Sequence, residues 1–139
     1  MAKRELLEDG RDRLPPGQFL TKRFTVLTYG STPKVELEGW TFNVSGYGLS
    51  QPMEWTMDEF LALGEHETTR DFHCVTTWSR YDNTWTGVPI EAVWSLIKPH
   101  LTEEIGAVML HCTCGYTTNL LIEDFLKEDN LFATHHDGK

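Results

Sequence analysis

The sequence has no long hydrophobic run and no export signal. Its longest apolar stretch, Ala107–Leu110, is far shorter than the roughly 20 residues that span a bilayer. The first residues are charged and lack an apolar core followed by a small-residue cleavage site, so no secretory signal is predicted. We therefore expect a cytoplasmic protein that does not cross a membrane.

Positive charge and cysteine are also scarce. The chain has 12 Lys and Arg against 21 Asp and Glu, a net charge of -9. This balance argues against nucleic acid or an anionic membrane as a partner, because phosphate groups favour clustered cations. The three cysteines are Cys74, Cys112 and Cys114. A small odd number without an export signal is typical of reduced thiols.

The composition is that of one globular domain. The chain has 139 residues, of which 40% are hydrophobic and 24% charged, which is ordinary for a folded protein. We expect residues 1–13 to be an exposed, partly helical charged leader and residues 14–139 to form the domain. Strand and short-helix patterns are mixed without a regular strand–helix–strand rhythm, which favours an α+β fold with a mixed β-sheet.

Hydrophobic periodicity and breaker residues predict the elements. Thr56 and Glu59 form a capping-box pattern, which predicts a helix from Thr56 to about Leu63. A turn is expected at Trp85–Pro89. The remaining expected elements are strands at 24–29, 40–44, 70–78, 107–112 and 131–134, and helices at 90–97 and 120–127.

The last strand is followed by Asp137 and Gly138, a strong hairpin signal. No partner strand follows in the sequence. We therefore expect the domain to be truncated at its C-terminus.

The segment Asp71–Ser79 holds the densest set of reactive residues, with Cys74 beside His73. A thiolate is the reactive and metal-binding form of cysteine, but one thiolate needs further ligands to hold a metal. A buried free cysteine in a strand is the alternative interpretation. A zinc site is a second alternative, although Cys-x-Cys is not the usual zinc spacing. Its ligands would come from His111, Cys112, Cys114, His135 and His136.

Together with Trp85–Val88, the block Asp71–Ser79 resembles the signature of the sulfite oxidase-like molybdopterin-binding oxidoreductases. Other blocks resemble that family in the same order, so the resemblance covers nearly the whole chain beyond the leader. The most similar branch contains small, haem-free, cytosolic proteins related to the catalytic subunit of the protein-methionine-sulfoxide reductase. The supporting blocks are 14–18, 24–30, 40–46, 115–120 and 131–138.

The resemblance implies a sulfite oxidase-type fold with a molybdenum-molybdopterin cofactor. Cys74 would be the protein's thiolate ligand to molybdenum, and the pterin would supply two more sulfurs. The implied reaction is oxygen-atom transfer with a small-molecule oxo donor or acceptor, as sulfoxide or N-oxide reduction or as sulfite oxidation. No haem-attachment motif is present, so a separate electron-transfer partner is expected. The alternative is a non-catalytic truncated domain of the same fold without cofactor.

Further residues are carried over from the family by position. Tyr116 would be catalytic, near the metal, and the register of the pterin contacts around His111–Thr113 stays open. Family members continue beyond this C-terminus with cationic residues that hold the pterin phosphate. The missing strands would leave an open sheet edge through which copies of the chain could associate. The expected cofactor-binding residues are Thr21, Phe24, Thr25, His73, Cys74 and Thr113.

Overall fold

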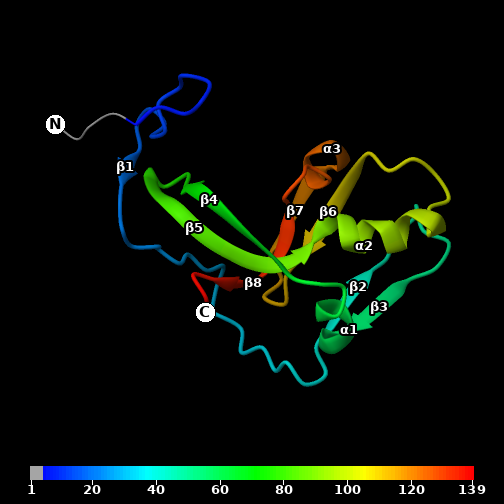
Figure 1. The fold of residues 1–139 in the computed structure, drawn as a ribbon. Coiled ribbons are helices and arrows are strands. Elements are labelled where there is room, and N and C mark those ends of the chain that lie inside the picture. Colours follow the sequence, from blue (N-terminus) through cyan, green and yellow to red (C-terminus); the bar gives the residue numbers. More distant parts are fainter. Residues whose placement is uncertain (1–4) are drawn as a thin grey trace.

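The computed structural model describes residues 5–139 (Figure 1). Strands and short helices are mixed, which confirms the α+β class. No helix in this part of the chain is long and apolar enough to cross a membrane. The elements are β1 (Phe19–Leu20), β2 (Thr41–Val44), β3 (Met53–Thr56), α1 (Met57–Leu61), β4 (His66–His73), β5 (Trp78–Pro89), α2 (Ile90–Ile97), the 3-10 helix η1 (Lys98–His100), β6 (Ala107–His111), β7 (Thr117–Leu121), α3 (Ile122–Phe125) and β8 (Leu131–His136).

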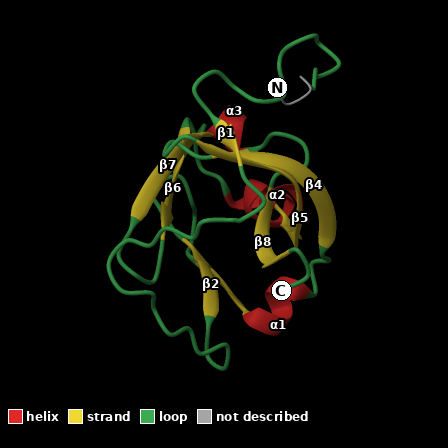
Figure 2. Cartoon of the chain, turned by 90° about the vertical axis from the view of Figure 1, so that its left-hand side faces the viewer, coloured by secondary structure: helices red, strands yellow, loops and turns green. Residues whose placement is uncertain are grey.

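The long strand β5 organises the main sheet. β4 pairs with it antiparallel along one side. On the other side, the start of β5 pairs with β1 in parallel and its end pairs with β8 antiparallel. Two separate antiparallel pairs, β2–β3 and β6–β7, complete the fold. Figure 2 shows α2 between the β6–β7 hairpin and the β4–β5 hairpin.

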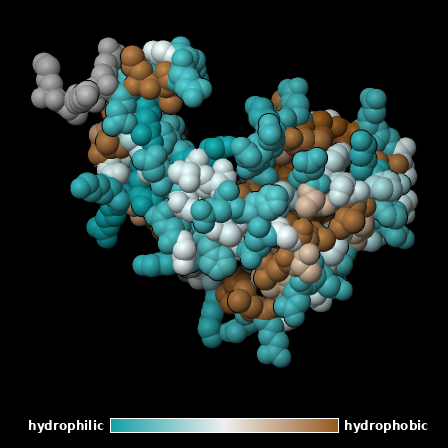
Figure 3. Space-filling view, in the orientation of Figure 1, coloured by the Kyte–Doolittle hydropathy of each residue, from teal (hydrophilic) through white to brown (hydrophobic). Residues whose placement is uncertain are grey.

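The core lies where α2 packs against the end of β5. Val88 is fully buried, and Phe60, Val93 and Ile97 join it in one cluster. The ring of Phe42 stacks on Phe60 at a centroid distance of 4.6 Å. Figure 3 shows that apolar atoms also reach the surface near α3 and around α2 and α1. The core lies in the right-hand part of the molecule in Figure 1. The turn between β4 and β5 lies at the opposite end, away from this core.

Several local predictions are confirmed. The strand expected at 40–44 is β2, and the helix expected at 90–97 is α2. The capping box forms as predicted: the side chain of Thr56 accepts a bond from the backbone of Glu59, whose side chain bonds back. After β8, Asp137 and Gly138 have φ angles of 49° and 74°. This is the geometry of a hairpin turn, and it pairs His136 with Lys139.

Two predictions, for residues 24–29 and 85–89, are wrong. Residues 24–29 form no strand, because Phe24 alone turns into an aromatic cluster while Val26 and Leu27 stay 75% and 62% exposed. The segment Trp85–Pro89 is not a turn but the end of β5. Its glycine, Gly87, allows the backbone of β8 to approach closely.

Three other expectations need correction. The residues expected as a helix at 120–127 begin as the end of β7, and only Ile122–Phe125 is helical. Cys74 lies in the turn after β4 and not within a strand. The described leader residues form no helix. A bridge joins Leu6 to Asp12 around a turn instead, and leader residues 1–4 lie outside the described part of the chain.

Candidate functional site

Cys74 begins the tight turn that connects β4 to β5. The N–H of Thr77 donates to the carbonyl of Cys74 at 3.0 Å, and the N–H of Cys74 donates to the carbonyl of Trp78 at 2.9 Å. Thr77 adopts a left-handed backbone conformation with a φ of 73°. For a β-branched residue this conformation is strained, and such strain persists only where the surroundings impose it. The turn that presents Cys74 is therefore held in an unfavourable shape by its neighbours.

The thiol of Cys74 is half-buried and has hydrogen-bond donors close by. The hydroxyl of Thr76 donates to Sγ of Cys74 at 3.2 Å. This bond is the main cause of a lowered pKa of Cys74, and the backbone N–H groups of Thr76 and Val75 add to it. Donors aimed at sulfur favour the thiolate over the thiol. The turn thus prepares the form of cysteine that binds a metal.

The segment before β1 braces this turn. Gln18 donates from Nε2 to the carbonyl of Cys74 at 3.0 Å, and its Oε1 accepts from the hydroxyl of Ser79 at 3.0 Å. Ser79 is fully buried, and its hydroxyl also lies 2.8 Å from Nδ1 of His73. The N–H of Phe19 donates to the carbonyl of Thr77. One side chain from the N-terminal segment therefore joins both ends of the Cys74 turn.

The next residues run along the start of β5. The N–H of Thr21 donates to the carbonyl of Ser79 at 2.9 Å, and Nε of Arg80 donates to the carbonyl of Lys22 at 3.2 Å. The guanidinium of Arg80 also donates to Asp137 at 2.5 Å. These bonds place Thr21 next to the start of β5, which follows the Cys74 turn.

Phe24 ends this segment inside an aromatic cluster. Its ring lies within 6 Å of the rings of Phe72, Trp78, Trp85 and His136. Phe24 therefore anchors the segment, while Thr25 beside it is exposed. The indole N–H of Trp78 is buried without a hydrogen-bond partner within residues 5–139. An unsatisfied buried donor four positions after Cys74 is a group that a bound ligand could satisfy.

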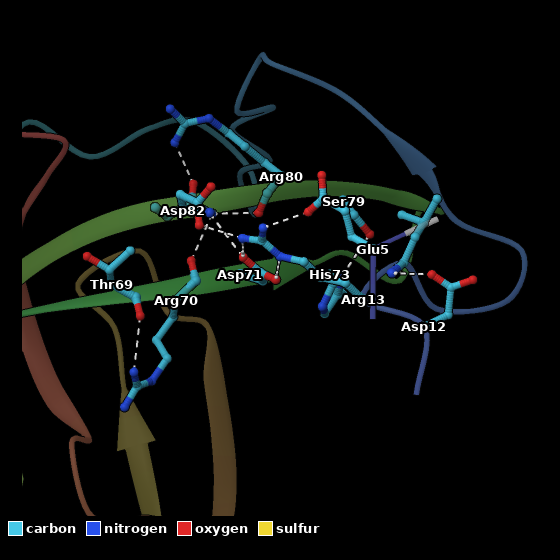
Figure 4. A network of polar contacts seen from close by, with 12 residues as sticks. Glu5, Asp12, Arg13, Thr69, Arg70, Asp71, His73, Ser79, Arg80 and Asp82 are labelled. Atoms are coloured by element: carbon cyan, nitrogen blue, oxygen red, sulfur yellow. Dashed lines mark hydrogen bonds and ion pairs between the residues drawn. The ribbon is translucent and has the colours of Figure 1, made fainter. Parts of the chain in front are cut away.

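A cluster of charges fixes the outer side of the β4–β5 hairpin (Figure 4). Asp71 lies at a bulge in β4 and accepts two bonds from the guanidinium of Arg13, at 2.7 and 2.8 Å. Arg13 also pairs with Asp82 and Glu5, and its guanidinium stacks on the ring of Tyr81 at 4.0 Å. Arg13, the last residue of the predicted leader, therefore binds to the β4–β5 hairpin that carries Cys74.

The other predicted site residues lie on the β6–β7 hairpin. Tyr116 is 47% exposed, and its ring lies 5.7 Å from that of Tyr29. It lines a cavity of about 500 Å³ together with Cys112 and Cys114. Thr113 and His111 line a larger cavity of about 930 Å³ between β2, α2 and β6. Cys74 lines neither of these two cavities.

The predicted residues therefore fall into two groups. The first gathers Thr21, His73 and Cys74 around the turn between β4 and β5, and the second places Thr113 and Tyr116 at the β6–β7 hairpin. The zinc alternative finds no support, because residues 5–139 contain no group of three or more histidine, cysteine or acidic side chains that could hold a metal. All three cysteines are free.

The sequence interpretation missed the roles of Gln18, Thr76 and Ser79. All three stand in the blocks that carry the family resemblance, and that is the only sequence signal that could have found them. Their contacts with Cys74 and with one another depend on the docking of β1 against β5. No local pattern in residues 14–18 encodes that docking.

Comparison with known proteins identifies the protein family of this chain. The family model of the oxidoreductase molybdopterin-binding domain matches residues 29–139. The chain belongs to this family. The match includes His73, Cys74, Thr113 and Tyr116, whereas Thr21, Phe24 and Thr25 precede it.

One curated relative is similar over most of this chain. It is the uncharacterized oxidoreductase YuiH of Bacillus subtilis (strain 168), which is 41% identical over 133 residues. The aligned region covers 94% of this chain and 65% of the relative. The chain thus spans less than two thirds of the length of that protein.

The residues around Cys74 fit a molybdenum-pterin group. The donor set offers one soft sulfur with its thiolate stabilised, which suits a cofactor that brings sulfur ligands of its own. Lys22 and Arg23 are the two residues after Thr21, and their cationic side chains form no ion pair within the described residues. An anionic pterin phosphate would find its counter-charges there.

Proposed function

We propose that this chain is the cofactor-binding part of a molybdenum-molybdopterin oxidoreductase that carries out oxygen-atom transfer, with Cys74 as the protein ligand to the metal. The observation that carries the proposal is the Cys74 turn, a strained and braced turn whose donors stabilise a thiolate. A cysteine kept only for packing would need neither the hydroxyl of Thr76 on its sulfur nor the brace from Gln18.

The group would supply two-electron redox chemistry and a transferable oxygen atom, and the protein would supply position and polarity. Cys74 would hold the metal. Thr21 and Phe24, with Lys22 and Arg23, would hold the pterin and its phosphate. His73 offers a polar ring at the surface beside the metal ligand. Thr25, Thr113 and Tyr116 remain members of the proposed site, in which Tyr116 would donate a hydrogen bond to substrate oxygen.

The charge pattern favours a neutral substrate. Arg70 and Arg80 flank the Cys74 block in the sequence, but Arg70 pairs with Asp129 and Arg80 with Asp137. A dianion such as sulfite requires further cations, beyond Lys22 and Arg23, which the proposal assigns to the pterin phosphate. We therefore propose reduction of a neutral sulfoxide or N-oxide over oxidation of sulfite. Methyl phenyl sulfoxide, trimethylamine N-oxide and sulfite, compared in one assay with a chemical electron donor or acceptor, separate these reactions.

The proposal includes a partner and a compartment. Electrons would come from a separate protein or small carrier, since the chain has no haem-attachment motif. The free state of all three cysteines supports a reducing, cytoplasm-like compartment. Association through an open sheet edge stays a prediction, which sedimentation of the purified chain checks.

The test is the metal content of two matched cysteine variants. The full chain is produced in cells supplied with molybdate, and molybdenum, tungsten and zinc are measured together. We expect molybdenum in the wild type and in Cys74→Ser a loss of at least 90% of it, whereas Cys114→Ser, which removes another free thiol, keeps it. Molybdenum retained by Cys74→Ser rules out the assignment. A wild type without molybdenum supports the alternative, a domain of this fold that binds no cofactor.

A further inference from the structure

The bonds around Gln18 determine more than the shape of the Cys74 turn. A carbonyl oxygen can only accept, so the group of Gln18 that faces the carbonyl of Cys74 must be its amide nitrogen. The other end of the amide, Oε1, can then only accept from Ser79. The orientation of the Gln18 side chain is therefore fixed by chemistry.

This orientation uses the one proton of the Ser79 hydroxyl. Ser79 is fully buried, and its oxygen lies 2.8 Å from Nδ1 of His73. Because the hydroxyl proton already points to Gln18, the hydroxyl can only accept from the histidine. Nδ1 of His73 must carry a proton. In the neutral ring, Nε2 is then unprotonated and is a hydrogen-bond acceptor.

His73 presents this acceptor at the surface. His73 is an exposed residue at the end of β4, directly before Cys74. Within the described residues, Nε2 of His73 has no hydrogen-bond partner. A ligand held at Cys74 that offers an N–H group would find a fixed acceptor there. A ligand that offers only acceptors would not.

We propose that Gln18 is a positioning residue that braces the Cys74 turn and fixes the tautomer of His73, so that Nε2 accepts a hydrogen bond from an N–H group of the ligand bound at Cys74. The ligand half of this inference rests on the proposed function. The part that concerns the tautomer of His73 involves only residues of this chain and needs no bound ligand. The two halves are therefore tested separately.

Two variants of Gln18 separate its two bonds. Gln18→Glu keeps an oxygen that accepts from Ser79 but loses the donor to the carbonyl of Cys74. Gln18→Ala loses both. Gln51→Ala, which shortens an exposed glutamine outside the site, is the control for the substitution itself.

The first readout is the tautomer of His73 in the full chain purified without molybdate. Nitrogen-15 correlation spectra at pH 8.5 distinguish the two neutral tautomers, and a His73→Gln sample assigns the signal. We expect the Nδ1–H tautomer in the wild type, in Gln18→Glu and in Gln51→Ala, and a mixture of tautomers in Gln18→Ala. A wild-type ring protonated on Nε2 alone overturns the proposal, as does a Gln18→Ala spectrum that matches the wild type.

The second readout is hydrogen exchange of the Thr77 amide, which donates to the same carbonyl as Gln18. Loss of one supporting hydrogen bond predicts exchange about tenfold faster in both Gln18 variants. Unchanged exchange in both variants refutes the brace.

The third readout is the molybdenum content of His73→Gln and His73→Phe. Gln retains an acceptor oxygen and Phe does not, so we expect His73→Gln to keep several times more metal. Equal contents refute the ligand contact and leave the tautomer result standing. Absence of molybdenum from the wild type as well counts against the proposed function and, with it, the ligand half.

Discussion

Gly87 lies where two strands approach too closely for a side chain, so replacing it with alanine tests the packing of β8 on β5. A methyl group built on Gly87 would lie 2.0 Å from the carbonyl oxygen of Phe132 and 2.8 Å from Cα of Ala133. An ordinary carbon–oxygen contact is about 3.3 Å. The three atoms nearest to that methyl group all belong to the backbone of β8, which cannot rotate away as a side chain could.

The free energy of unfolding should fall by about 3 kcal/mol. Inserting a methylene into a packed interior costs about 1–3 kcal/mol when side chains can adjust. Here a strand must move by more than about 1 Å, and that strand also carries Phe132, which packs on the core. The effect should therefore reach the upper end of that range.

Urea unfolding followed by tryptophan fluorescence measures this difference. Gly106→Ala is the matched control, because a methyl group there meets nothing within 4 Å, and it should change stability by less than about 0.5 kcal/mol. A loss below about 1 kcal/mol for Gly87→Ala would mean that β8 does not pack on β5 as described.

Two further predictions concern the hairpin that carries Cys74. Hydrogen bonds from Arg13 hold the pKa of Asp71 below its ordinary value, so the stabilisation is complete above the unfolded-state pKa near 4 and is lost as the pH falls through the folded-state value. Asp71→Asn should lower the free energy of unfolding by about 2 kcal/mol at pH 7 and flatten the decline of the urea midpoint below about pH 4; an equally steep acid decline in this variant would contradict the assignment. Thr77→Gly should raise stability by about 1 kcal/mol, because glycine adopts the left-handed conformation of this position without strain. A less stable Thr77→Gly protein in the same urea titration would show that the turn carries no strain.

Local sequence patterns correctly predicted the elements that are defined by residues close together in the sequence. The capping box of Thr56 and the apolar face of residues 90–97 each lie within one helix, and both were confirmed. The segment 24–29 alternates like a strand but pairs with no other strand, since the aromatic cluster takes only Phe24. Gly87 and Pro89 were interpreted as turn residues. In the structure one permits close strand packing and the other precedes the first residue of α2.

The site was predictable in part for the same reason. Cys74 and His73 are neighbours in the sequence, so their combination could be recognised from a short block. Gln18 is separated from Cys74 by 56 positions. Its role depends on the parallel pairing of β1 with β5, a long-range contact that hydrophobic periodicity does not encode.

The same parallel pairing sets an order of events during synthesis. Residues 18–22 leave the ribosome first, yet their partners at the start of β5 follow more than fifty residues later. The β4–β5 hairpin closes a short loop, whereas docking of the N-terminal segment closes a long one and so comes later. A nascent chain therefore holds its thiol on an unbraced hairpin for a time. Only the return of the first-made segment gives Cys74 its fixed position.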